Sequence, residues 1–351
     1  MPEDKMDDTM ENIIYKEKLV REYIEQGDKE AAIKLLFELA VHYARDKNFE
    51  AAEAMRSRIL DIDPMALSAI VNSGDIIEEE KYKAIDRGHR EIWAKLYQDL
   101  GVVEANTLYF ALKKATFQTE ETISRQGELK PRIYFINSGR IKVVYFKDGE
   151  EVFLKHVEPG QLAGEDAFFY PTFCTTSMIA LCRTELSYLD SDILKVWATT
   201  SPMLESKLND FATKSPNILD LLKAKAIDRR RLKRIPFSGK ATVHLMNSSD
   251  DQVGKPFKVN MGNISRGGTC FYVRIPKRET ANLLLGKRLR INYTPPQMGA
   301  SHLIRQSGTI VALRFHPLDD CTVCVKFDSL LPEALIEQLE KMSQPPQDFD
   351  Y

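Results

Sequence analysis

Apolar residues recur at helical spacing in the first third of the chain. The segments Lys29–Ala40 and Phe49–Leu60 each place them three and four positions apart, which is the spacing of an amphipathic helix. Polar residues 46–48 supply a turn between the two segments, and Asp63 and Pro64 end the second. The pattern therefore predicts a helical hairpin.

Short runs that alternate apolar and polar residues follow from about Glu91 to Tyr188. Tyr134–Phe146 reads as two strands about a glycine turn, and Val152–Val157 follows a second turn. Several strands at this spacing favour a jelly-roll or a barrel. Helical spacing returns from about Asp190 to Ile227.

The last third of the chain, Asp228–Leu330, alternates again. Six short strands with no long helix between them predict a small antiparallel barrel, and Pro332–Met342 adds a short amphipathic helix. The six runs are Ala241–Leu245, Phe257–Asn260, Cys270–Ile275, Leu289–Tyr293, Gly308–Leu313 and Thr322–Phe327.

Composition places the chain among folded globular proteins. Its 351 residues are 43% hydrophobic and 28% charged, and the length favours two or three domains. With neither a run of eighteen apolar residues nor a basic-then-apolar leader, we expect no membrane insertion and no secretion. Five scattered cysteines argue against a disulfide framework and favour a reducing cytoplasm.

The net charge of −2 conceals a strong asymmetry along the chain. Asp228–Leu330 holds 18 lysines and arginines against 7 aspartates and glutamates, a net charge of +11, which leaves −13 for the remainder. The C-terminal part is therefore suited to meet an anion.

The densest basic run is Lys223–Arg234, with seven basic residues and one acidic residue. Arginine can grip a phosphate with two hydrogen bonds and can stack on a purine. A solvated linker or a nucleic-acid patch would look the same, so the run alone decides nothing. A second polar element, Asn263-Ile-Ser265-Arg-Gly-Gly268, follows and is typical of a tight turn whose glycines let a ligand approach the main chain. A plain hairpin turn is the alternative.

Taken together, Arg230-x-x-x-Arg234 and Asn263-x-Ser265-x-x-Gly268 resemble the two-part signature of PilZ domains, which are receptors for the bacterial second messenger cyclic di-GMP. The resemblance covers roughly the last third of the chain. It implies that Arg230 and Arg234 clamp phosphate and guanine, with Arg229 as a third contact. It also implies that Asn263 and Ser265 contact a base and that Gly268 lets the ligand approach the main chain.

The middle of the chain, about Glu91–Lys214, resembles the cyclic nucleotide-binding domain of the catabolite activator type. The hairpin Ile136–Tyr145, the Pro159-Gly160 turn and the strand Thr184–Leu189 carry the resemblance. Gly164 and Glu165 match the start of the family's phosphate-binding segment, in which the glutamate holds the ribose hydroxyl and an arginine holds the cyclic phosphate.

The arginine position of that segment falls on or next to Cys174, and no arginine occurs between Arg140 and Arg183. A buried phosphate would lack its countercharge, which is costly at low dielectric. We therefore expect a degenerate pocket that serves as scaffold. Cyclic AMP binding stays open, because backbone amides at a helix start can hold an anion. The pocket positions are Gly164, Glu165, Thr175 and Thr176.

The alanine rhythm of the N-terminal helices and their closing Asp-Pro resemble a tetratricopeptide repeat, which implies a protein partner. A generic helical hairpin is an equal alternative, and a homodimer through the helices after Pro202 is possible.

Other chemistry-bearing residues give no enzyme, metal or cofactor signal. Cys321-Thr-Val-Cys324 lies on a predicted strand, where positions three apart face opposite sides, so we interpret these residues as core cysteines. The six histidines are far apart, and Glu78–Glu80 reads as a solvated helix end. We expect no catalytic residue, no bound metal and no cofactor.

The fold class we predict is a multidomain α+β chain. It has a tetratricopeptide-like helical hairpin module over 1–90, a cyclic nucleotide-binding-like β jelly-roll over 91–214, a linker helix with the arginine clamp over 215–234, and a six-stranded antiparallel PilZ β-barrel with a C-terminal helix over 235–351. Its expected function is that of a cytoplasmic bacterial effector that binds cyclic di-GMP and transmits a domain rearrangement to a protein partner. A cyclic AMP sensor and a nucleic-acid-binding regulator are the alternatives, although we expect no DNA partner because a barrel stands where such activators carry a helix-turn-helix.

Overall fold

The structure is a computed structural model of the whole chain. It describes residues 3–129, 131–170, 172–225, 232–275, 283–295, 303–316 and 320–343, with the backbone alone in 3–11 and 342–343. The chain divides into two compact units, Met1–Leu112 and Lys113–Tyr351.

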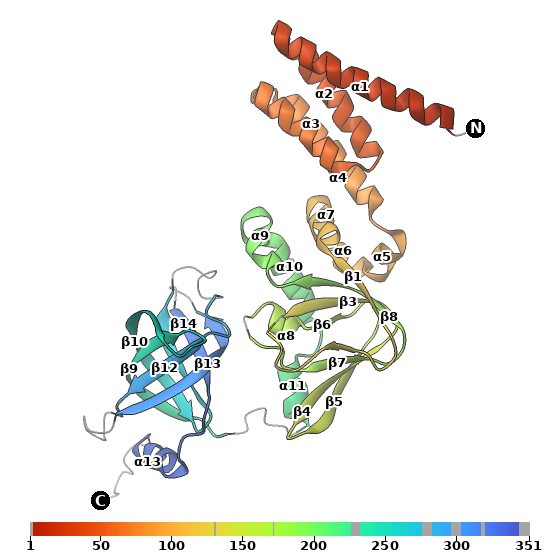
Figure 1. Cartoon of the computed structure of the whole chain (residues 1–351). Coiled ribbons are helices and arrows are strands. Elements are labelled where there is room, and N and C mark those ends of the chain that lie inside the picture. The colour runs from red at the N-terminus through yellow and green to blue at the C-terminus, as the bar shows by residue number, and fades with distance from the viewer. Residues whose placement is uncertain are drawn as a thin grey trace, which may run out of the picture. The chain divides into compact units, whose positions relative to one another are not determined.

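The first unit is helical (Figure 1). Its helices are α1 (Glu3–Gln26), α2 (Lys29–Arg45), α3 (Phe49–Ile62), α4 (Leu67–Ala84), α5 (Arg87–Ile92), α6 (Ala94–Tyr97) and α7 (Val102–Ala111). The predicted hairpin is confirmed as α2 and α3, each started by a side-chain cap. Asp28 accepts from the N–H of Ala31, and Asn48 accepts from the N–H of Ala51. The likeness to a tetratricopeptide repeat stays a prediction.

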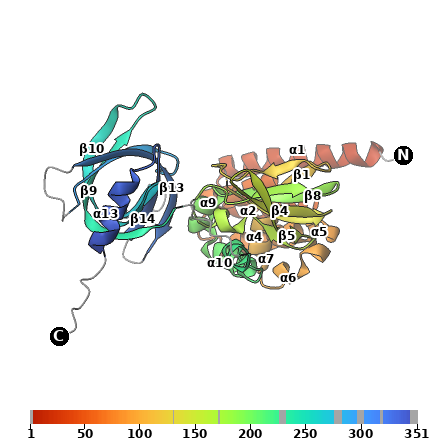
Figure 2. The same ribbon diagram turned by 90° about the horizontal axis from the view of Figure 1, so that it is seen from below.

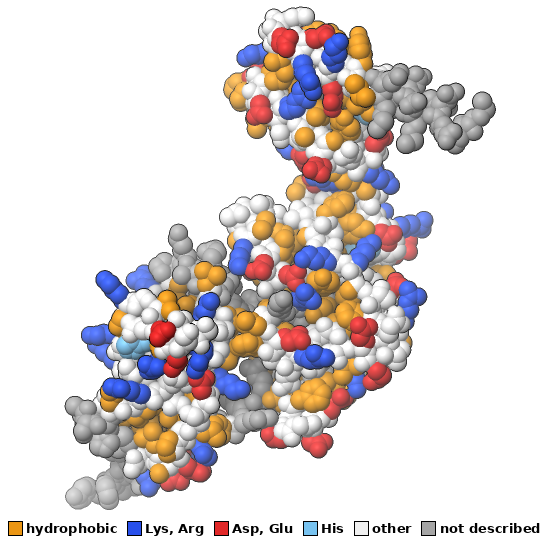
Figure 3. Space-filling view, viewed as in Figure 1, with side chains coloured by type: hydrophobic (Ala, Val, Ile, Leu, Met, Phe, Trp, Pro, Cys, Tyr) orange, Lys and Arg blue, Asp and Glu red, His pale blue; other side chains and the backbone are white. Residues whose placement is uncertain are grey.

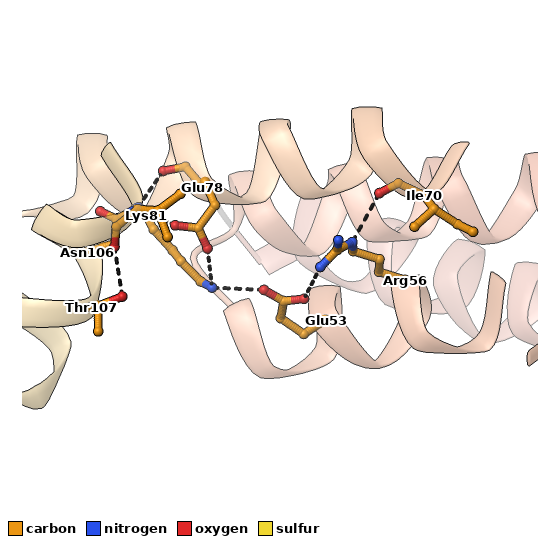
Figure 4. Close-up of polar contacts among 8 residues, drawn as sticks. Glu53, Arg56, Ile70, Glu78, Lys81, Asn106 and Thr107 are labelled. Atoms are coloured by element: carbon orange, nitrogen blue, oxygen red, sulfur yellow. Dashed lines mark hydrogen bonds and ion pairs between the residues drawn. The ribbon is translucent and has the colours of Figure 1, made fainter. Parts of the chain in front are cut away.

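Ion pairs join α3 to α4, and an amide hydrogen bond joins α4 to α7, inside this unit (Figure 4). Lys81 Nζ lies 2.9 Å from both Glu53 Oε1 and Glu78 Oε1, and Asn106 Nδ2 donates to the backbone O of Glu78 at 2.8 Å. Glu78 is therefore part of a half-buried network that ties three helices, which the expectation of a solvated helix end missed. The adjacent Glu80 pairs with Lys83 at 2.8 Å.

The second unit begins with a β jelly-roll, as predicted. Two four-stranded sheets, in the orders β1-β8-β3-β6 and β2-β7-β4-β5, face each other. Ile136, Ile141 and Leu186 lie in the core between them. The strands are β1 (Lys113–Phe117), β2 (Thr122–Ser124), β3 (Arg132–Ser138), β4 (Ile141–Lys147), β5 (Glu150–Val157), β6 (Leu162–Ala163), β7 (Ser177–Ala180) and β8 (Thr184–Asp190).

Helices flank and follow the jelly-roll: α8 (Glu165–Phe168), α9 (Ile193–Thr200), α10 (Pro202–Thr213) and α11 (Ile218–Ala224). Ile218 and Leu222 of α11 are buried in the same cluster as the sheet side chains, so α11 is anchored to the jelly-roll. Across all the described residues, no helix has both the length and the apolar character needed to span a bilayer.

A closed barrel follows, with the six strands in the order β10-β11-β14-β13-β12-β9 and every pairing antiparallel. This confirms the predicted fold class. Val243, Ile291 and Val323 are among the side chains that fill its interior. The strands are β9 (Ile235–Met246), β10 (Gln252–Ser265), β11 (Gly268–Arg274), β12 (Arg288–Tyr293), β13 (Ile304–Phe315) and β14 (Asp320–Phe327).

One more helix, α13 (Glu333–Ser343), covers an end of the barrel (Figure 2). Its Ile336 and Leu339, with Leu331 just before it, belong to the cluster that fills the barrel. The amphipathic helix predicted for this stretch therefore closes the core and is part of the domain.

The cysteines of the barrel depart from the sequence interpretation. Cys321 is buried in the barrel core, as expected of a core cysteine. Cys270 and Cys324 instead face outward, directly opposite each other on β11 and β14, and form a disulfide with a Cα–Cα distance of 4.2 Å. The interpretation of Cys324 as a core cysteine was therefore wrong, because strand pairing brings it beside a cysteine 54 positions away.

Candidate functional site

The polar motif Asn263–Gly268 forms the connection between β10 and β11. Two side chains brace it: the Ser265 hydroxyl donates to the backbone O of Gly268 at 3.1 Å, and the Thr269 hydroxyl donates to the backbone O of Asn263 at 2.6 Å. Ser265 is 6% exposed. The tight turn predicted from the sequence is present, and the Ser265 hydroxyl already bonds within it.

Asn263 presents an unsatisfied acceptor. A bulge between Met261 and Asn263 shifts the alternation of β10, so that Met261 and Ile264 both face the core and Asn263 faces outward. Its Oδ1 is buried, and no described group donates a hydrogen bond to it. A buried acceptor of this kind costs about 1–3 kcal/mol unless a donor reaches it.

A side chain at either glycine of the motif would collide with neighbouring atoms. A Cβ on Gly268 would lie 2.3 Å from the backbone O of Val325 on β14, and one on Gly267 would lie 2.7 Å from Cδ1 of Leu232. Neither glycine has positive φ. The close approach of other chain segments, and not a left-handed backbone, is therefore what favours glycine at these two positions.

Part of the predicted arginine clamp lies against this motif. Arg229 and Arg230 fall outside the described residues. Arg234 is exposed, and its Nη1 lies 3.5 Å from Sγ of Cys270, the residue paired with Asn263 across the strands. The structure thus brings Arg234 and Asn263 to one surface of the barrel.

The C-terminal helix anchors both halves of the signature, a role that the sequence analysis missed. Lys233 forms an ion pair with Glu340 of α13. Arg266, inside the motif, donates from Nε to the backbone O of Leu331 at 3.2 Å and pairs with Glu333 at 3.3 Å. The available signal was an arginine within the turn together with acidic residues in the terminal helix.

The charge asymmetry of the sequence lies on the surface of the barrel. Lysine and arginine side chains are conspicuous on its visible face in Figure 3. Lys233, Arg234 and Lys240, which flank the start of β9, are all exposed. This surface suits an anionic ligand.

The second candidate pocket, in the jelly-roll, begins at Gly164. Gly164 adopts φ 84° at the start of α8, and a Cβ there would lie 2.2 Å from the backbone O of Arg132. Only glycine fits both constraints. Thr175 donates a hydrogen bond to Asp166, and Thr176 is 1% exposed. Of the four predicted pocket positions, Gly164 and Glu165 therefore lie at the start of α8, and Thr175 and Thr176 lie in the loop just before β7.

The pocket glutamate is already paired. Lys155 Nζ lies 3.2 Å from Glu165 Oε1, and the side chains are 16% and 13% exposed. Burial raises the pKa of the Glu165 carboxyl, and the attraction of Lys155 offsets only part of this. Sequence reasoning missed Lys155 because a bulge between Val143 and Val144 changes which β5 residues face inward.

Cys174 occupies the place expected for the phosphate-binding arginine. Its N–H donates to the backbone O of Glu128 at 2.9 Å, and its backbone O accepts from the N–H of Gly127 at 2.8 Å. Burial raises the pKa of its thiol. A neutral thiol cannot neutralise a phosphate, which is consistent with the predicted degeneracy.

Models of two protein families match the chain in these two regions. The model of the cyclic nucleotide-binding domain matches residues 114–198, and the model of the PilZ domain matches residues 228–343. The chain therefore carries a cyclic nucleotide-binding domain followed by a PilZ domain.

Curated relatives resemble the middle of the chain. Over 98 residues it is 29% identical to the CRP-like cAMP-activated global transcriptional regulator of Mycobacterium tuberculosis, in strains CDC 1551 / Oshkosh and ATCC 25618 / H37Rv. That match covers 28% of this chain and 44% of each relative, so the chain spans less than half their length.

Two solved structures are similar to the same region. The catabolite activator protein of Thermus thermophilus is 21% identical, with a TM-score of 0.32, over 37% of this chain and 60% of that chain. The N-terminal domain of a transcriptional regulator from Streptomyces coelicolor A3(2) is 24% identical, with a TM-score of 0.31, over 37% of this chain and 88% of that chain.

Proposed function

We propose that this protein is a second-messenger effector that binds cyclic di-GMP through its PilZ domain. The observation that carries the proposal is the juxtaposition of Arg234 with Asn263, whose buried Oδ1 lacks a donor among the described residues. Cyclic di-GMP offers two phosphates for arginine and two guanines whose N–H groups suit an amide oxygen.

In this proposal the ligand is held between the arginine run and the outer surface of β10 and β11. Arg230 and Arg234 grip phosphate and the Hoogsteen edge of guanine, with Arg229 as a further contact. Asn263 and Ser265 face a base, and Gly268 keeps the sheet surface open beside them. Binding and signalling are the whole of the proposed activity, with no catalytic step.

Isothermal titration calorimetry on the full chain tests this site. We expect wild type to bind cyclic di-GMP, and Arg230→Ala and Arg234→Ala to weaken binding at least about tenfold each, because one bidentate contact contributes roughly 1–3 kcal/mol. Lys255→Ala is the matched control, since it removes an exposed positive charge from β10 outside the motif. No heat with wild type, or equal losses in all three variants, would refute the site.

We further propose that the ligand acts by ordering the connection between the two domains. The clamp lies between α11, which is anchored in the jelly-roll, and β9, which begins the barrel. Closing Lys223–Arg234 over a ligand would change how the barrel is held, and a protein partner would recognise the change.

A second candidate function is cyclic AMP sensing through the jelly-roll, favoured by Gly164 and Glu165 at the start of the phosphate-binding segment. The pairing of Glu165 with Lys155 and the presence of Cys174 weigh against it. Calorimetry with cyclic AMP decides: binding that survives Arg230→Ala and is lost in Glu165→Ala would place the main input here.

The basic barrel also fits nucleic acid as a ligand. Fluorescence anisotropy with random duplex DNA separates this possibility, because binding driven by phosphate contacts falls steeply with added salt. We expect no binding at moderate salt. Salt-sensitive DNA binding that cyclic di-GMP does not displace would favour the nucleic-acid function.

A further inference from the structure

The outward-facing cysteine pair lies beneath the proposed ligand site. Asn263 of β10 stands opposite Cys270 of β11, and Cys270 stands opposite Cys324 of β14. The three residues thus form one row across the outer surface of the barrel. Although it faces outward, Cys270 is only 2% exposed, and the guanidinium of Arg234 contacts its sulfur at 3.5 Å.

We infer that Cys270 and Cys324 are a thiol–disulfide modification site that sets the affinity of the adjacent ligand site, an inference that rests in part on the proposed function. As a disulfide the pair carries no charge, so it does not attract the guanidinium of Arg234 as an ion would. As a reduced pair, Cys270 can present a thiolate that attracts the guanidinium and opposes a phosphate brought to the same place.

The chemistry of the step is thiol–disulfide exchange with a small-molecule disulfide. Cys324 is partly exposed and Cys270 is buried, so the Cys324 thiolate attacks first and releases one small thiol. The Cys270 thiolate, stabilised by Arg234, then attacks the mixed disulfide at Cys324 and releases the second small thiol. One disulfide bond forms in the protein, one is broken in the oxidant, and two thiols leave.

Two features of the structure suit this step. Strand pairing holds the two Cα atoms 4.2 Å apart, slightly below the usual range of about 4.4–6.8 Å for a disulfide, so the two sulfurs can meet with only a small backbone movement. The partners lie on adjacent strands that are already hydrogen-bonded to each other, so the barrel does not depend on the disulfide to stay closed. The site can therefore change its chemical state while the domain stays folded.

The test uses full-length protein equilibrated with reduced or oxidised glutathione, with cysteine states read by alkylation and peptide mass spectrometry. We expect Cys270 and Cys324 to be linked in the oxidised sample, and the dissociation constant for cyclic di-GMP to rise about tenfold on reduction, the size of one charge-assisted hydrogen bond. Cys324→Ser and Cys324→Ala should bind alike in both buffers. Cys182→Ser, which removes an exposed free cysteine elsewhere, should behave as wild type.

The outcomes separate the two proposals. Failure of oxidised glutathione to link the cysteines, or equal affinity in both states, overturns the inference. If the link forms and no cyclic di-GMP binds in either state, the proposed function and the control of affinity both fall. The modification site itself then stands or falls on a ligand-free readout: alkylation of Cys270 should be slower in reduced Cys324→Ala carrying Arg234→Gln than in reduced Cys324→Ala.

Discussion

Two acidic residues of the jelly-roll show how local surroundings set opposite proton affinities. Asp190 accepts from Lys113 Nζ at 2.6 Å and from Arg132 Nε at 2.7 Å. Its partial burial would raise the pKa of its carboxyl, but these two hydrogen bonds outweigh burial and lower it. Glu165 has one cation and deeper burial, so the pKa of its carboxyl is raised. The balance between hydrogen-bond donors, which lower the pKa of a carboxyl, and burial, which raises it, decides the direction of the pKa shift.

Asp190→Asn should weaken the sheet that contains β1, β3 and β8. Because the pKa of Asp190 is lowered, its stabilising effect is present above its usual value of 3.8 and is lost as pH falls through the lowered pKa. We expect a loss of at most about 1 kcal/mol at pH 7, after allowance for solvent screening, and a smaller loss near pH 3. Hydrogen exchange of the backbone amides in these strands measures the loss of stability at each pH. Asp192→Asn, an exposed neighbour, is the control, and an equal loss there would refute the assignment.

Glu165 should give the opposite pH trend. Because the pKa of its carboxyl is raised, the contribution to stability is fully present below the usual value of 4.5 and is lost as pH rises through the raised pKa. Wild type should therefore lose stability relative to Glu165→Gln from pH 4.5 upward, measured by exchange of β5 and α8. Lys155→Met removes the partner and should extend that window to higher pH. A trend of the opposite sign would show that the ion pair dominates burial.

At the scale of the element, the two glycines of the β10–β11 connection separate stability from binding. Gly268→Ala forces a methyl group into the backbone of β14 and should destabilise the barrel by about 2–4 kcal/mol. Gly267→Ala meets two flexible side chains, with Leu232 Cδ1 at 2.7 Å and Leu330 Cδ2 at 3.6 Å, so thermal stability should change little while cyclic di-GMP binds about tenfold more weakly. Calorimetric melting and titration of both variants give the comparison. If Gly267→Ala lowered the melting temperature and left binding unchanged, the position of Leu232 would have no effect on the arginine clamp.

The sequence was sufficient for the elements whose signals are local. Capped helices such as α2 and α3, and alternating strands such as β12, were predicted in place. Residues 241–245 were predicted as a strand, but β9 runs from Ile235 to Met246. Its first part alternates buried and exposed residues and pairs with β10, but it contains Pro236, a residue type that counts against a strand in the sequence.

From the sequence we could predict only those features of the site that depend on residue type. The Asn263–Gly268 motif and the arginine run were visible in the sequence. The unsatisfied Oδ1 of Asn263, the pairing of Cys270 with Cys324 and the inward turn of Lys155 depend on strand register and on bulges. Register is a property of two strands together, so one strand's sequence does not reveal it.

At the scale of the whole molecule, the segment that connects the jelly-roll to the barrel is also the most basic segment of the chain. Seven basic residues and one acidic residue lie in Lys223–Arg234, which runs from the end of α11 to the start of β9. Like charges in one short segment repel one another, and a ligand with two phosphates removes that repulsion. Binding and a change in the connection between domains are therefore expected to be one event.

Small-angle X-ray scattering of the full chain, with and without saturating cyclic di-GMP, measures that event. Neutralising the segment should let it fold against β10 and β11, so the distribution of interatomic distances should shift when ligand is added. Arg230→Ala at the same ligand concentration is the control and should keep the ligand-free profile, because it lacks a clamp contact. Identical wild-type profiles, in samples that calorimetry shows to be saturated, would mean that the ligand is bound without moving the domains. The signal would then have to pass through the ligand-covered surface of the barrel itself.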